Sequence, residues 1–119
     1  MTPLARRLGQ ALLDHHKTHC RNIDCAAEEL TDSQVRDNCV TYLDISLRCG
    51  GPVPRFSGPF LDEIGRWCQG NHWPSLPSLV VNGKTGVPGP GYAKLHVVAD
   101  WKKQVRRCIG FKGYPDTMP

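Results

Sequence analysis

The residues best able to do chemistry in this chain are its six cysteines and five histidines. His15, His16, His19, Cys20 and Cys25 fall within a short stretch, and His15 and His19 are spaced i, i+4 on one face of a helix. A structural zinc site needs four ligands, commonly from two short spacings, and only Cys20 and Cys25 form such a pair. We expect no metal or other cofactor, and a zinc site at this cluster stays open as an alternative.

An even number of cysteines in a short secreted chain would predict disulfides. Here no apolar stretch of signal-peptide length follows Arg6 and Arg7, and several cysteines fall at apolar positions of helical patterns. The sequence therefore predicts reduced thiols in a cytoplasmic protein, without a membrane-spanning segment.

The histidine cluster, with Asp14 beside it, also raises the possibility of a small nuclease-type toxin. General acid–base catalysis needs a base and an acid on either side of a substrate, and histidines at a helix end are more often polar surface. The glycines between Gly83 and Gly91 alternate with prolines and lack the Lys-Ser/Thr that follows a phosphate-binding loop. We therefore expect a binding protein rather than an enzyme, and keep the nuclease as a second alternative.

Positive charge is concentrated late in the chain, within a formal net charge of +4. Between Lys84 and Lys112, Asp100 is the one acid among many lysines and arginines. Such a field attracts polyanions because their condensed counterions are released, so duplex DNA is the partner we expect. A solvated helix face with no partner is the alternative. The expected phosphate contacts are Lys84, Lys94, Lys102, Lys103, Arg106 and Arg107.

Helical patterns must position these residues. Thr2 as N-cap and Pro3 at the first helical position predict a helix to about His19. The capping-box pattern that starts at Thr31 predicts a second helical stretch, which either runs unbroken from 32 to 48 or pauses near Val40.

If that stretch pauses, Thr41 offers a new N-cap, and Leu43 with Leu47 would form the apolar face of a short helix. Two further helices are expected over 57–69 and, after Asp100 as N-cap, over 101–109.

A β-hairpin is expected between these last two helices. Leu76 to Val81 is predicted to be a strand, Asn82 to Gly86 a turn with Asn-Gly at its start, and Val87 the beginning of a short return strand.

The order helix, turn, helix, hairpin is that of a winged helix-turn-helix. The predicted fold class is α+β and mainly helical: a winged helix-turn-helix-like domain with a β-hairpin, plus an N-terminal and a C-terminal helix. We expect a single domain, with an N-terminal helical region over 1–30, the winged-helix-like core over 31–92, a basic C-terminal helix over 93–112 and a flexible tail over 113–119. An α+β domain with this order and no nucleic-acid role is the alternative.

Residues 40–92 resemble the DNA-binding domain of the alkylguanine-DNA alkyltransferases and their catalytically inactive alkyltransferase-like relatives. Val40-Thr41-Tyr42 resembles that family's entry into the first helix of its motif, and Arg55-Phe56-Ser57-Gly58 resembles the Arg-x-x-Gly that starts its recognition helix. Leu76-Pro77, Val80-Val81-Asn82 and Gly91-Tyr92 resemble its active-site strand and wing. The stretch is also similar to small proteins of prophages and antiviral defence islands.

The resemblance implies recognition without chemistry. The alkyltransferases carry Pro-Cys-His-Arg where Pro77 is followed by Ser78-Leu79-Val80, so the nucleophile and its activating base are missing. It implies that Tyr42 lies beside a backbone phosphate at a flipped nucleotide, that Arg55 fills the resulting gap, and that Ser57 belongs to the same binding set. Alternatively, Tyr42 packs in the core and Arg55 is a solvated turn residue.

The sequence thus favours a non-catalytic winged-helix protein that binds duplex nucleic acid mainly through backbone phosphates. The first alternative is a small protein–protein effector or inhibitor from a phage or other mobile element, which would use an apolar or aromatic patch near Trp73 and Trp101.

Overall fold

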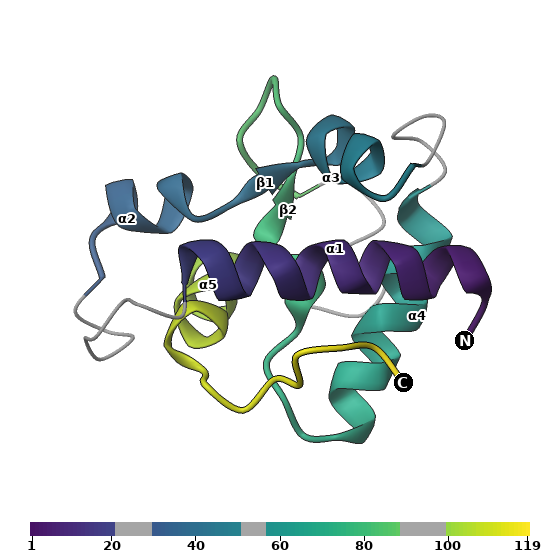
Figure 1. Cartoon of the computed structure of the whole chain (residues 1–119). Helices are drawn as coiled ribbons and strands as arrows, with labels where there is room; N and C mark the ends of the chain where they lie inside the picture. The colour runs from purple at the N-terminus through teal and green to yellow at the C-terminus, as the bar shows by residue number, and fades with distance from the viewer. Residues whose placement is uncertain (21–29, 51–56, 89–99) are drawn as a thin grey trace.

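Helix α1 (Pro3–His19) runs across the front of the molecule in a computed structural model that describes residues 1–20, 30–50, 57–88 and 100–119 (Figure 1). The Thr2 hydroxyl accepts a hydrogen bond from the Ala5 amide at 3.2 Å, and Pro3 occupies the first turn, where its missing N–H costs nothing. The predicted N-terminal helix is confirmed. Of the N-terminal helical region expected over 1–30, residues 21–29 lie outside the described part of the chain.

The helical stretch expected over 32–48 is interrupted near Val40, which confirms the second of the two alternatives. Helix α2 (Asp32–Asp37) starts with a complete capping box, in which Thr31 and Gln34 satisfy each other's backbone N–H groups. Helix α3 (Tyr42–Arg48) starts at a second N-cap, because the Thr41 hydroxyl accepts from the Asp44 amide at 3.1 Å. Local capping therefore decides where both helices begin.

The later helices also follow the sequence pattern. Helix α4 (Ser57–Gly70) and helix α5 (Trp101–Gly110) each end one residue beyond the expected position. Asp100 occupies the N-cap of α5, although its side chain makes no capping hydrogen bond. A 3-10 helix, η3 (Leu76–Leu79), contacts both α4 and α5 and connects them through the core.

The strand prediction is wrong over its first four residues, which form η3 because Pro77 and the turns around it favour a tight helical turn. Only Val80–Val81 (β2) is a strand, and it pairs in parallel with Val40–Thr41 (β1). The Asn82–Val87 turn closes through the Asn82 amide, which donates to the Val87 carbonyl oxygen at 2.8 Å. Within the described ranges no strand returns after this turn, and the segment from 89 to 99 lies outside them. The fold is mainly helical with a two-stranded parallel sheet.

The core forms where α1, α3, α4, η3 and α5 meet. Leu8 and Leu12 of α1, Ile45 of α3 and Ile64 of α4 are all buried in it. Leu43 and Leu47, expected as the apolar face of α3, are instead 57% and 65% exposed. That expectation is wrong because α3 turns Ile45, two residues from each leucine and so on the opposite face, toward the core.

The C-terminal tail, expected to be flexible, lies against the other elements. Tyr114 is buried and its hydroxyl donates to the Pro74 carbonyl oxygen. Gln10 of α1 accepts from the Met118 amide at 2.9 Å and donates to the Asp116 carbonyl oxygen at 3.0 Å. Figure 1 shows the tail passing beneath α1 toward the lower end of α4. A buried aromatic side chain and paired backbone groups therefore place the tail against α1 and the residues before η3.

None of the helices in the described part of the chain has the length and hydropathy that a bilayer crossing requires.

Candidate nucleic-acid interface

Helix α5 presents one buried face and one charged face. Trp101, Val105, Cys108 and Ile109 point into the core. The indole N–H of Trp101 donates to the Ser78 carbonyl oxygen at 2.8 Å, which fixes the start of α5 against η3. The lysines and arginines of α5 must therefore lie on its flanks and outer face.

Two of these cations lie on the flank that faces α2. Lys102 Nζ is 3.3 Å from one Asp32 carboxylate oxygen, and Arg106 Nη2 is 2.7 Å from the other. Arg106 Nε also donates to the Leu30 carbonyl oxygen at 3.2 Å. Lys102, through its hydrogen bond and charge, and then Arg106 lower the pKa of the Asp32 carboxyl. Lys102 and Arg106 thus hold α2 against α5, and one of their two positive charges is neutralised locally.

Lys103 and Arg107 lie on the outer face of α5. They are spaced i, i+4, and the 100° step per residue turns them away from the buried face. Both side chains are exposed, and neither forms an ion pair or hydrogen bond with another described residue. Lys112 differs, because its ammonium group donates to the Cys20 carbonyl oxygen at 3.1 Å. The outer face of α5 therefore offers two cations one helical turn apart that no described acid pairs with.

Lys84 lies on the Asn82–Val87 turn, which protrudes at the top of Figure 1. Its backbone N–H donates to Asn82 Oδ1 at 2.8 Å, and its side chain is exposed. A Cβ atom at Gly83 would lie 3.5 Å from the Thr41 methyl group, so this turn covers the start of α3. Tyr42, the next residue, is half-buried against the core.

The structure brings Tyr42 and Lys84 to the same end of the two-stranded sheet, because they follow the carboxyl ends of β1 and β2. Helix α5 begins beside Ser78, which precedes β2 and so lies toward the other end of that strand. Figure 1 shows the turn that carries Lys84 at the top of the molecule and α5 lower down, behind α1. Arg55 and Lys94 lie outside the described residues, and Ser57 begins α4 without a described side chain.

Helix α4, the expected recognition helix, carries no net positive charge. Its charged residues are Asp62, Glu63 and Arg66, and the Glu63 carboxylate accepts a hydrogen bond from the Thr2 hydroxyl at 2.8 Å. Phosphates would meet more negative than positive charge along this helix. Among the described residues, the exposed cations expected to contact phosphate therefore lie on α5 and on the Asn82–Val87 turn, and not on α4.

The expectation that the histidine cluster is polar surface is wrong for two of its members. His15 and His16 are 3% and 4% exposed. His15 Nε2 is 2.7 Å from the Asn38 carbonyl oxygen, and His16 Nε2 is 2.7 Å from that of Cys108. Both rings connect α1 to a neighbouring element, and neither is open to a substrate. Their spacing after Leu8 and Leu12 continues the apolar positions of α1, which is the signal that could have revealed their burial.

The five described cysteines are free thiols, and Cys25 lies outside the described residues. Burial raises the pKa of Cys20 to about 12 and that of Cys68 to about 11. Thiols held in this protonated form are poor nucleophiles and poor metal ligands. Within the described ranges, no three histidine, cysteine or acidic side chains come together as a metal site.

Comparison with protein-family models, curated proteins and solved structures finds no match to this chain. The case for function therefore depends on the charged surface itself.

Proposed function

We propose that the protein binds duplex nucleic acid through backbone phosphates, with Lys103, Arg107 and Lys84 as its principal contacts. The observation that carries this proposal is the pair of exposed cations on the outer face of α5, which have no partner among the described residues. Neighbouring ammonium and guanidinium groups contact phosphates with little demand on geometry.

The proposed contact reads the backbone more than the bases. Long, solvated side chains place charge along a phosphate chain, whereas base recognition needs a groove-reading element with donors at fixed positions. In this proposal, α3, α4 and the Asn82–Val87 turn act as a winged helix-turn-helix, with Lys84 on the wing. The binding is non-catalytic, and we propose that the protein works in the cytoplasm on the duplex DNA of a mobile element or its host.

Fluorescence anisotropy with a labelled duplex over a salt series tests the proposal. Three phosphate contacts predict a slope of log K against log salt of about −2.7, at about 0.9 per contact. Lys102 and Arg106 are left out of this count because Asp32 already pairs with them. Failure to bind at about 50 mM salt, or a flat slope, would exclude binding dominated by phosphates.

A matched pair of variants locates the contact. We expect Lys103→Glu/Arg107→Glu to abolish binding, while Arg6→Glu/Arg7→Glu changes net charge equally and retains most of it. Arg6 and Arg7 are both exposed and lie on α1, outside the proposed interface. Equal losses in the two double variants would show that net charge alone drives binding.

A second candidate, a protein–protein effector, is favoured by Leu43 and Leu47, the most exposed leucines described. The patch expected near Trp101 is not available at Trp101 itself, because that residue is only 6% exposed. A partner that is captured after nuclease treatment, survives high salt and is lost in Leu43→Ser/Leu47→Ser would favour this candidate over the first.

A further inference from the structure

His15 lies where α1, the end of α2 and the last turn of α3 meet. Its Nε2 atom is 2.7 Å from the carbonyl oxygen of Asn38, the C-cap of α2. Its Nδ1 atom is 3.4 Å from Nη1 of Arg48, the last residue of α3. The ring is 3% exposed, so water cannot replace either neighbour.

These two neighbours fix the protonation state of the ring. A carbonyl oxygen only accepts hydrogen bonds, so Nε2 must carry the proton. A guanidinium group only donates, so Nδ1 must offer its lone pair. The closed arrangement therefore requires the neutral Nε2–H form of His15, and a second proton on Nδ1 would meet the N–H groups of Arg48.

The other groups on α1 around the ring do not stabilise a protonated His15. On α1, the His19 ring stacks on His15 with centroids 4.3 Å apart, and its Nδ1 is 3.2 Å from the His15 carbonyl oxygen. His16, the next residue, contacts the Cys108 carbonyl oxygen and Tyr114, and its charge further lowers the pKa of His15.

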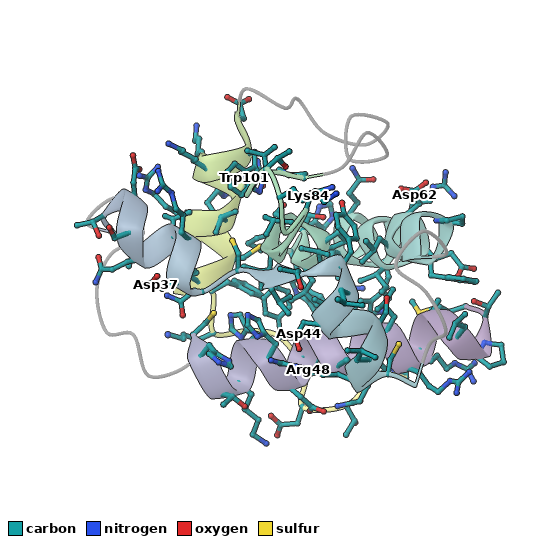
Figure 2. All side chains as sticks on the ribbon, turned by 90° about the horizontal axis from the view of Figure 1, so that it is seen from above. Asp37, Asp44, Arg48, Asp62, Lys84 and Trp101 are labelled. Carbon is teal, nitrogen blue, oxygen red and sulfur yellow. The ribbon has the colours of Figure 1, made fainter. Side chains whose placement is uncertain are left out.

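From α2 and α3, no negative charge is available to a protonated ring. The Asp44 carboxylate is 2.8 Å from Arg48 Nη2 and is already paired with it (Figure 2). Asp37, which ends α2, is exposed and forms no ion pair with the ring, and the Cys20 thiol is directed to Asn38 Oδ1. No described carboxylate contacts the His15 ring.

We propose that the contact of α1 with α2 and α3 is a proton-sensitive latch: protonation of His15 separates its ring from Arg48 and Asn38 and opens this corner of the molecule. Thr41, the N-cap of α3, pairs with Val81 and lies beside Gly83, so opening at the Arg48 end of α3 also loosens the base of the Asn82–Val87 turn. This inference stands whether or not the protein binds nucleic acid.

The direction of the response follows from the pKa of His15. Burial first, and then the charges of His19 and Arg48, lower this pKa below its usual value, against the opposing effect of the Asn38 hydrogen bond. In the open form the ring is solvated and titrates near its ordinary pKa of about 6.5. The latch is therefore closed above about pH 6.5, and its opening constant rises up to about tenfold per pH unit as pH falls toward the pKa of the closed form.

Amide hydrogen exchange of α3 between pH 8 and pH 5, expressed as protection factors, measures the opening. We expect protection at Ile45 to fall up to about tenfold per pH unit below about pH 6.5 in the native protein. His15→Gln keeps a neutral donor for Asn38 and an acceptor for Arg48, so it should remove this pH dependence. His19→Gln, the matched control on the same helix, should retain it.

Persistence of the pH dependence in His15→Gln, or its loss in His19→Gln alone, would overturn the proposal. If His15→Gln does not fold, the native protein still decides, through the NMR titration of the His15 ring. A ring that takes up its proton with no parallel loss of α3 protection overturns the proposal, and a coincident midpoint supports it.

Discussion

Val105 tests whether α5 is held to the core through its inner face. The side chain is 0% exposed. Val105→Ala removes two methyl groups, worth about 1.6 kcal/mol at about 0.8 kcal/mol each. The cavity left behind adds about 1 kcal/mol, and the better helix propensity of alanine returns about 0.5 kcal/mol. We expect the free energy of unfolding to fall by about 2 kcal/mol, which lowers Tm by about 6–12 °C in a domain of this size.

Denaturant unfolding followed by circular dichroism, with a thermal melt beside it, measures this change. Val87→Ala is the matched control, since the same two methyl groups are removed from a side chain that is 44% exposed. We expect the control to change stability by less than about 0.5 kcal/mol. Equal effects of the two substitutions would refute the placement of α5, and with it the argument that Lys103 and Arg107 face outward.

Three further predictions concern the tail, the core and the ion pairs. Tyr114→Phe leaves the Pro74 carbonyl oxygen without its donor, so we expect a loss of about 1–2 kcal/mol in unfolding free energy. Leu12→Ala should cost about 2–5 kcal/mol because Leu12 is fully buried, and Leu47→Ala should cost less than about 0.5 kcal/mol. Asp32→Asn releases the two α5 cations that it holds, so the salt slope for duplex binding should steepen by up to about 1.8.

Each of these has an outcome that contradicts it. Unchanged stability in Tyr114→Phe would mean that the tail is not anchored in solution; Lys17→Ala, which removes an exposed ion pair with Asp116, is its near-neutral control. A large loss in Leu47→Ala would place that face of α3 in the core. An unchanged salt slope in Asp32→Asn would show that the released cations do not reach phosphate.

The helices could be predicted from the sequence because their start signals are local. Thr2, Thr31 and Thr41 each hydrogen-bond an amide two or three residues into their own helix, so a few neighbouring letters are enough. The break between α2 and α3 could be offered only as an alternative. It is fixed by the pairing of Val40 with Val80, and these two residues are forty positions apart in the sequence.

Features that depend on distant contacts were not accessible in the same way. Nothing in the tail sequence alone says that Tyr114 finds the Pro74 carbonyl oxygen. The apolar spacing of Leu43 and Leu47 is the same whether a partner covers them or not, and only the position of Ile45 against the core decides.

For the candidate site, the sequence identified where positive charge gathers but not which charges are already paired. In the sequence alone, Lys102 and Arg106 cannot be distinguished from Lys103 and Arg107. The 100° helical step places the first two toward Asp32, seventy or more residues earlier in the chain, and leaves the other two at the surface. Choosing between them requires the position of α2 relative to α5.

The most direct measurement of the central claim is the number of phosphates that the outer face of α5 neutralises. Anisotropy salt series on the native protein and on Lys103→Gln/Arg107→Gln should give slopes that differ by about 1.8, which corresponds to two lost contacts. An identical slope in both proteins, with duplex binding intact, would contradict the assignment of the interface to α5.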